Sequence, residues 1–169
     1  MTKKLFPLFG ILFFMYSCGS SKKISSKKPT KHHISKASKK KITTADKIVW
    51  TAVSFKGVPY KYGGTNKKGM DCSGLIYTSF KKRNISLPRT SKLMYLKGNP
   101  IPLNSVKRGD LLFFKTTRKR GKVNHVGLIT SVKNGTIRFI HSTSSRGVLI
   151  SSLREKYWKN AFIKAKRVL

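Results

Sequence analysis

Five short apolar runs, rich in β-branched and aromatic residues, fill the last third of this 169-residue chain. Clusters of Gly, Asn or Ser separate them, including Asn134-Gly135, a pair that strongly favours a two-residue hairpin turn. Short strands joined by tight turns pair with their neighbours in an antiparallel sheet. The sequence therefore predicts strands at residues 111–114, 126–131, 136–141, 148–151 and 162–168.

Two helical patterns precede these strands. Thr43 and Thr44 are candidate N-caps, and the apolar residues that follow them recur at helical spacing until about Gly57. A second helix is expected to begin around Cys72 and to end before Asn84. Helices followed by a run of strands indicate the α+β class, with the N-terminal helices packed on an antiparallel sheet.

The first 17 residues have the pattern of an export signal. Lys3 and Lys4 precede a 12-residue apolar stretch, which is too short to span a membrane as a helix. Cys18 follows among small residues, as in a bacterial lipobox, so we expect cleavage before Cys18 and its lipidation. An ordinary signal peptide with an incidental cysteine is the alternative. Residues 18–42 are then a disordered Lys- and Ser-rich tether, and residues 43–169 are the folded domain.

The chain is strongly basic, with 38 Lys and Arg against 4 Asp and Glu and a net charge of +34. Such a charge predicts an anionic partner: nucleic acid, anionic lipid or an acidic wall polymer. The export signal argues against nucleic acid. So few carboxylates leave little room for paired-carboxylate hydrolysis and exclude a carboxylate-rich metal site, and two cysteines cannot form a disulfide framework.

Cys72 is the first candidate for chemistry. It stands at a loop-to-helix junction, where free N–H groups and the positive end of the helix dipole favour a thiolate. We therefore expect the pKa of its thiol to lie below the ordinary value of about 8.5. A buried structural cysteine is the alternative.

Two histidines complete a possible nucleophile–base arrangement. His125 stands at the entrance to a predicted strand, and a thiol nucleophile needs a base within hydrogen-bond reach. His141 stands at the end of the next predicted strand. Neighbouring antiparallel strands can place the two imidazoles side by side, so that one orients the other as in a catalytic triad. Histidines that are merely packed in the sheet are the alternative.

Residues 57–76, which contain Asp71-Cys72-Ser73-Gly74, resemble the signature of the NlpC family of bacterial cell-wall cysteine endopeptidases. The resemblance extends over nearly all of residues 43–169, with the motifs in the same order. Its further motifs are residues 87–91, 108–114, 125–128, 139–142 and 157–158.

The resemblance implies a papain-like α+β fold with the nucleophile at a helix N-terminus, on a helix that packs against the sheet. It implies that Cys72 is the nucleophile, His125 the general base and His141 the third, orienting residue. It also implies a set of residues that shape or contact the substrate site: Tyr60, Asp71, Ser73 and Arg89.

The implied activity is hydrolysis of an amide bond in the stem peptide of peptidoglycan, between the γ-carboxyl of D-glutamate and the following diamino acid. No metal and no cofactor are expected. We expect a monomeric, exported protein that is anchored in the bacterial envelope through lipid and the basic tether, in the periplasm or at the outer membrane. The alternatives are a non-catalytic basic lipoprotein that binds wall or membrane, and an acyltransferase or amidase of the same fold superfamily.

Overall fold

The computed structural model describes Gly19, residues 41–117 and residues 123–169. The chain divides into a unit at residues 1–38 and a second unit at residues 39–169, and all described helices and strands belong to the second. The expected export signal, Cys18 and residues 20–40 of the expected tether lie outside the described residues. Among the helices that the structure describes, none has the length and apolar character needed to cross a membrane.

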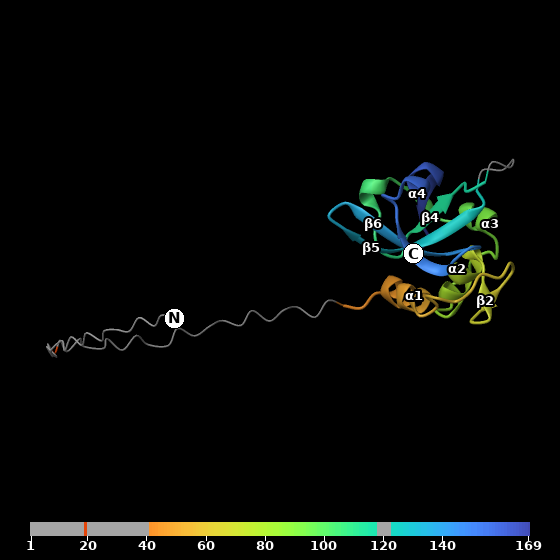
Figure 1. The fold of residues 1–169 in the computed structure, drawn as a ribbon, viewed down its shortest axis with the longest axis horizontal. Coiled ribbons are helices and arrows are strands. Elements are labelled where there is room, and N and C mark those ends of the chain that lie inside the picture. Colours follow the sequence, from red (N-terminus) through yellow and green to blue (C-terminus); the bar gives the residue numbers. More distant parts are fainter. Residues whose placement is uncertain (1–18, 20–40, 118–122) are drawn as a thin grey trace, which may run out of the picture. The chain divides into compact units, whose positions relative to one another are not determined.

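A six-stranded antiparallel sheet forms the centre of the second unit (Figure 1), with the strand order β3-β8-β4-β5-β6-β7. The β5–β6 turn has positive φ angles at Asn134 (48°) and Gly135 (67°), as a type I′ hairpin requires. The strands are β3 (Asn99–Ile101), β4 (Leu111–Phe114), β5 (His125–Lys133), β6 (Thr136–Thr143), β7 (Gly147–Ser152) and β8 (Phe162–Arg167).

Helices cover both faces of this sheet. Figure 1 shows α1 (Thr44–Val53) and α2 (Cys72–Lys81) on one side of the sheet and α4 (Lys156–Ala161) on the other. The remaining elements are short: α3 (Ser91–Tyr95), a 3₁₀ turn at Leu103–Ser105, and a small hairpin of β1 (Thr65–Asn66) and β2 (Gly69–Met70).

Two hydrophobic cores result from this arrangement. Along β4, Leu111 and Phe113 are buried in the core beneath α1 and α2, whereas Leu112 and Phe114 are buried in the core beneath α4. Successive strand residues point to opposite faces, so a strand covered on both faces is a continuous apolar run. This explains why β4 is apolar at all four positions.

The α+β class and the antiparallel sheet are confirmed. The first helix is shorter than expected, because it ends at Val53 and not near Gly57. After Val53 the chain continues in tight turns, and the Gly57 N–H leaves helical bonding to donate to the carbonyl of Val148 in β7. Gly57 adopts a positive φ of 87° there, a conformation that glycine tolerates without steric cost.

Candidate active site

Cys72 is the first residue of α2, as the sequence predicts. The helix begins there because Asp71 is its N-cap: the Asp71 backbone is extended, and its carboxylate accepts the Gly74 N–H at 2.6 Å. This satisfies one of the donors that every helix leaves unpaired in its first turn. The Cys72 side chain is only partly exposed.

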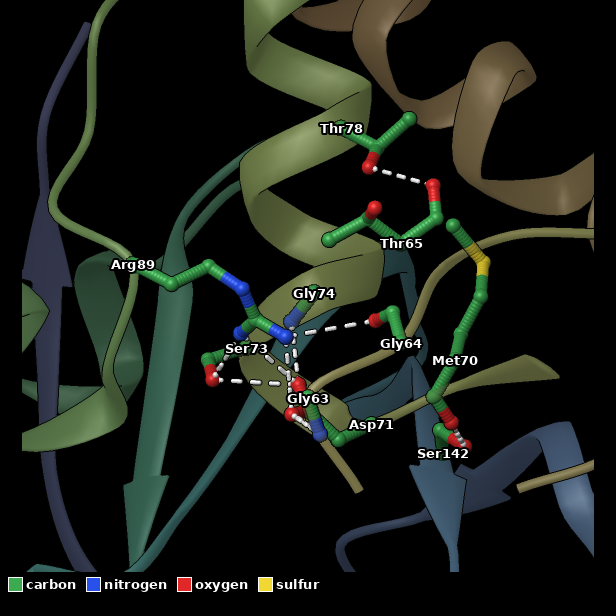
Figure 2. Close-up of polar contacts among 10 residues, drawn as sticks. All are labelled: Gly63, Gly64, Thr65, Met70, Asp71, Ser73, Gly74, Thr78, Arg89 and Ser142. Carbon is green, nitrogen blue, oxygen red and sulfur yellow. Dashed lines mark hydrogen bonds and ion pairs between the residues drawn. The ribbon is translucent and has the colours of Figure 1, made fainter. Parts of the chain in front are cut away.

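The Asp71 carboxylate is also the centre of a polar network next to Cys72 in the chain (Figure 2). It accepts the Gly63 N–H at 2.8 Å and the Ser73 hydroxyl at 3.2 Å. Arg89 binds both carboxylate oxygens, at 3.0 and 2.8 Å, and donates to Ser73 Oγ at 3.0 Å. A bidentate Arg–carboxylate pair fixes geometry as well as adding binding energy, so this network holds the start of α2 in place.

Burial alone would raise the pKa of Asp71. Hydrogen bonds from Arg89 and from the Gly74 N–H, together with the positive charge of Arg89, outweigh burial, and the pKa of Asp71 lies below its ordinary value. Asp71 is therefore ionised at neutral pH. The expected contacts of Asp71, Ser73 and Arg89 with substrate stay predictions, since the contacts described here are those that these side chains make with one another and with the adjacent loop.

The loop that precedes α2 is fastened to both the helix and the sheet (Figure 2). Three hydrogen bonds to its carbonyls come from Arg89 to Gly64 (3.3 Å), from the Thr78 hydroxyl to Thr65 (3.0 Å), and from the Ser142 hydroxyl to Met70 (2.7 Å). The approach is so close that a Cβ atom at Gly74 would overlap the carbonyl oxygen of Gly64. Glycine is required at this position because the loop lies directly on the first turn of the helix.

The expected lowering of the Cys72 pKa is wrong for the structure as described. Burial raises the pKa of the Cys72 thiol to about 11, and backbone hydrogen bonds from Val126, Ser73 and Cys72 itself oppose this only in part. The helix N-terminus does favour the thiolate, but removal of the sulfur from water favours the neutral thiol more strongly. Cys72 is therefore a neutral thiol near pH 7.

His125 and His141 do come together, as the strand pairing predicts. His125 Nε2 and His141 Nδ1 are 3.0 Å apart, and both side chains are buried. Leu128 of β5 pairs with Ile140 of β6, which places His125 and His141 diagonally on one face of the sheet. His125 Nε2 is engaged in the hydrogen bond with His141. The other ring nitrogen of His125, Nδ1, is therefore the one that can take a proton from a thiol.

Burial lowers the pKa of His125 to about 4. It also lowers the pKa of His141, to about 2, with smaller contributions from His125, when that ring is protonated, and from the positive charge of Arg146. Both rings are therefore neutral at physiological pH, each with one N–H donor and one acceptor nitrogen. Neutral His125 is in the protonation state that a general base requires.

Two residues at this site were not identified from sequence chemistry. Trp158 of α4 stacks on His125 with ring centroids 5.3 Å apart, and it meets His141 edge-on at 4.5 Å. Ser151 of β7 places its Oγ 3.1 Å from His141 Nε2. Trp158 lies in a motif that carries the family resemblance, whereas Ser151 is signalled only by its register in a predicted strand.

Cys72 lies in the wall of a cleft of about 620 Å³. Within residues 41–117 and 123–169, no three His, Cys, Asp or Glu side chains group as a metal site. Burial raises the pKa of Tyr60, as do Cys72, once ionised, and the negative charge of Asp71, so its hydroxyl stays protonated and able to donate. The cleft brings Cys72 together with all four residues expected at the substrate site. It is lined by Tyr60, Tyr62, Gly63, Asp71, Cys72, Ser73, Arg89, Thr90, Ser91, Lys92, Val123 and Asn124.

The chain is similar to known peptidases along most of its folded part. It is 34% identical over 129 residues to the murein DD-endopeptidase/murein LD-carboxypeptidase MepS of Escherichia coli (strain K12), covering 76% of this chain and 65% of that protein. It is 34% identical over 125 residues to the γ-D-glutamyl-L-lysine dipeptidyl-peptidase of Bacillus subtilis (strain 168), covering 73% of this chain and 41% of that enzyme.

The fold is also similar to that of solved structures. The crystal structure of an NlpC/P60 family protein from Bacillus cereus ATCC 10987 superimposes with a TM-score of 0.66 at 32% sequence identity, over 74% of this chain and 40% of that one. Residues 57–167, which include Cys72, His125, His141 and Ser151, match the NlpC/P60 family as a whole. The chain therefore belongs to the NlpC/P60 family.

Proposed function

We propose that this protein is a cysteine endopeptidase that hydrolyses an amide bond in the stem peptide of peptidoglycan. The observation that carries the proposal is the His125–His141 hydrogen bond at 3.0 Å. His125 is the neighbour in sequence of Val126, whose backbone N–H hydrogen-bonds to the Cys72 thiol at the N-terminus of α2. The relatives named above, which cleave murein or γ-D-glutamyl peptides, support the substrate class.

Attack begins from a neutral thiol and a neutral imidazole. As Cys72 Sγ bonds to the substrate carbonyl carbon, the thiol proton moves to His125 Nδ1, and the Nε2–H of the resulting imidazolium donates to His141. In this proposal the oxyanion lies against the Cys72 backbone N–H, which belongs to the first turn of α2. The Tyr60 hydroxyl donates to it as well, and its presence in the lining of the same cleft supports this role.

Collapse of the tetrahedral intermediate breaks the C–N bond. His125 returns its proton to the departing amine, and the acyl group stays on Cys72 as a thioester. A water molecule then attacks the thioester, His125 takes a proton from that water, and the carboxylic acid leaves as the thiol re-forms. His125 therefore acts as the general base in both halves of the reaction: it takes the proton of the thiol in the first half and the proton of the water in the second.

We assign the cleaved bond as the one between the γ-carboxyl of D-glutamate and the following diamino acid. The name of the Bacillus subtilis relative supports this bond, whereas the name of the Escherichia coli relative favours a DD bond. The stem peptide is rich in carboxylates, which suits a folded domain that holds 27 of the 38 basic residues and all four acids.

The test is digestion of purified, reduced muropeptides, followed by liquid chromatography and mass spectrometry, with the full chain and its Cys72→Ala variant. Products with a new amino terminus on the diamino acid are expected from the wild type, and none from Cys72→Ala. Cleavage of the cross-link alone would assign the DD bond in place of the γ-D-glutamyl bond. Binding of wall without any new product would overturn the enzymatic proposal in favour of a non-catalytic wall protein. Transfer to an added amine in place of water would indicate an acyltransferase.

We further propose that the protein works outside the cytoplasm, anchored through lipid on Cys18. The support is the sequence alone: a short apolar stretch, Cys18 among small residues, and a following segment with nine lysines and no acid. One lipid anchor plus a polybasic segment supplies the two attractions that stable membrane binding needs. Intact-mass measurement of protein extracted from membranes tests this, and a mature N-terminus other than modified Cys18 would contradict it.

A further inference from the structure

We propose that Ser151 is a positioning residue for this reaction: it holds His141 in the one tautomer that lets His125 act as the base. The inference rests on the proposed function, because it concerns the protonation path of the same site. Its basis is the 3.1 Å contact between Ser151 Oγ and His141 Nε2. Both groups are buried, with 3% and 0% of the residue exposed, so water does not compete for this hydrogen bond.

The sheet itself dictates this contact. His141 of β6 pairs with Leu149 of β7, and Ser151 stands two residues further along β7. Residues two apart in a strand share a face, so Ser151 is the diagonal neighbour of His141 on that face. His125 is the diagonal neighbour of His141 from the other side, on β5. Three adjacent strands thus place His125, His141 and Ser151 in one row.

The hydrogen bonds along this row are directional. His125 can take the thiol proton on Nδ1 only if its own proton is on Nε2, where it donates to His141 Nδ1. His141 Nδ1 must then be an acceptor, which places the single proton of neutral His141 on Nε2. That Nε2–H points to Ser151 Oγ, which accepts it.

Loss of the hydroxyl would penalise this tautomer specifically. With alanine at position 151, the productive tautomer would leave a buried N–H without a partner, whereas the opposite tautomer would leave only a bare nitrogen lone pair. A buried N–H group without an acceptor is rarer in proteins than a buried acceptor without a donor, and it carries the larger free-energy penalty. His141 would then carry its proton on Nδ1, facing His125 Nε2. His125 would be forced to hold its own proton on Nδ1, where the thiol proton has to go.

The experiment compares Ser151→Ala, Ser151→Thr and Ser79→Ala in the full chain, using a defined γ-D-glutamyl-diamino acid peptide. Ser79 is the matched control, because it is equally buried but donates to the Leu75 carbonyl within α2, away from both histidines. We expect Ser151→Ala to lower kcat by about 10- to 100-fold with little change in KM, since a buried donor loses its partner. Ser151→Thr keeps Oγ and is expected to restore most of the rate. Ser79→Ala is expected to stay close to the wild type.

A second readout does not depend on activity. Two-bond ¹H–¹⁵N correlation spectra of the histidine rings report which nitrogen carries the proton. We expect His141 to be protonated on Nε2 in the wild type and in Ser151→Thr, and a population protonated on Nδ1 to emerge in Ser151→Ala. Unchanged ring tautomers in Ser151→Ala, or an unchanged kcat in an active wild-type background, would overturn the role of Ser151. A wild type that cleaves no muropeptide but shows the expected tautomers would refute the proposed function and leave the arrangement of the row intact.

Discussion

The rings of His125 and His141 stand almost perpendicular, at 87°, with His125 Nε2 directed at His141 Nδ1 over 3.0 Å. The third member of this arrangement is therefore a neutral imidazole, not a carboxylate. It supplies a hydrogen-bond acceptor and an orientation for His125, but no full negative charge to stabilise the imidazolium.

This geometry predicts unequal costs for substitutions at the two histidines. His125→Ala removes the base and should lower kcat by about 10²- to 10⁴-fold or more. His141→Asn keeps an acceptor beside His125 and should retain more activity than His141→Ala, which keeps none. The measurement is turnover of the defined peptide by each variant, with folding checked by circular dichroism. If His141→Asn and His141→Ala were both as inactive as His125→Ala, the roles assigned to the two rings would have to be exchanged.

A second prediction concerns the resting state of the nucleophile. Burial raises the pKa of Cys72 to about 11 and lowers the pKa of His125 to about 4, so between these values the resting pair is neutral thiol and neutral imidazole. Without substrate, the rate of Cys72 alkylation by iodoacetamide should rise about tenfold per pH unit from pH 7 towards pH 10. Free cysteine, the control, should level off above its pKa of about 8.5. The rate is followed on the Cys72 peptide by mass spectrometry, which separates it from Cys18. A rate that is already at its plateau at pH 7 would mean a preformed thiolate–imidazolium pair.

The Asp71–Arg89 pair should contribute to stability in a pH-dependent way. The pKa of Asp71 is lower in the folded protein than its ordinary value, so the pair stabilises the fold fully above about pH 4 and loses this contribution as the pH falls further. Asp71→Asn should therefore reduce the free energy of unfolding by about 1–3 kcal/mol at pH 7, a value discounted for the 32% exposure of the Arg89 side chain.

Urea unfolding at pH 7 and at pH 3 measures this effect. The difference between wild type and Asp71→Asn should shrink at pH 3, because this pH lies below the ordinary pKa of an aspartate, so the unfolded wild type binds a proton there and unfolding is favoured. Glu155→Gln is the control, since Glu155 is exposed and accepts a single backbone N–H, from Ser152. It should change stability by no more than about 0.5 kcal/mol at either pH. Equal losses for Asp71→Asn at both pH values would show that the charge of Asp71 is not the stabilising element.

The proposed tether should affect retention rather than catalysis. A chain that starts at Lys41 keeps α1 and its cap, in which Thr43 and Asp46 bond each other reciprocally. It should cleave soluble muropeptides at close to the full-chain rate but bind intact wall and anionic vesicles more weakly. Added salt should reduce binding of the full chain towards that of the shorter one, because exposed charges are screened. A loss of activity on small soluble substrates would give residues 1–40 a role in the site.

The parts of the fold that could be predicted from sequence are those with a long or sharply bounded pattern. Strand β4 was placed at its observed bounds because turn residues flank four consecutive apolar residues. The short helices α3 and α4 were missed, since five or six residues are too few to display helical periodicity. Strand β3 was missed as well, because only three residues, one of them Pro100, pair with β8 at the sheet edge.

The candidate site also has features that the sequence predicts and features that it does not. Cys72, His125 and His141 could be picked out as candidates because their residue types are the ones that nucleophilic chemistry uses, and the contact between the two histidines is confirmed. The pKa of Cys72 was predicted in the wrong direction, because a helix terminus is visible in sequence whereas burial of the sulfur is set by packing against β5. Ser151 and Trp158 are common residue types whose meaning depends on which histidine they contact, and only the tertiary structure gives that.

Ser142 binds the carbonyl of Met70 across 72 residues of sequence, and the row of three strands that ends at Ser151 begins 53 residues after Cys72. An unfolded chain, whether newly synthesised or in transit through a translocation channel, thus contains every side chain of the site without any of its geometry. In that state Cys72 is an ordinary solvated thiol, and no base is within reach of it. Hydrolytic competence would then appear only once the sheet has brought His125 and His141 together, so the unfolded chain needs no inhibitory segment to stay inactive.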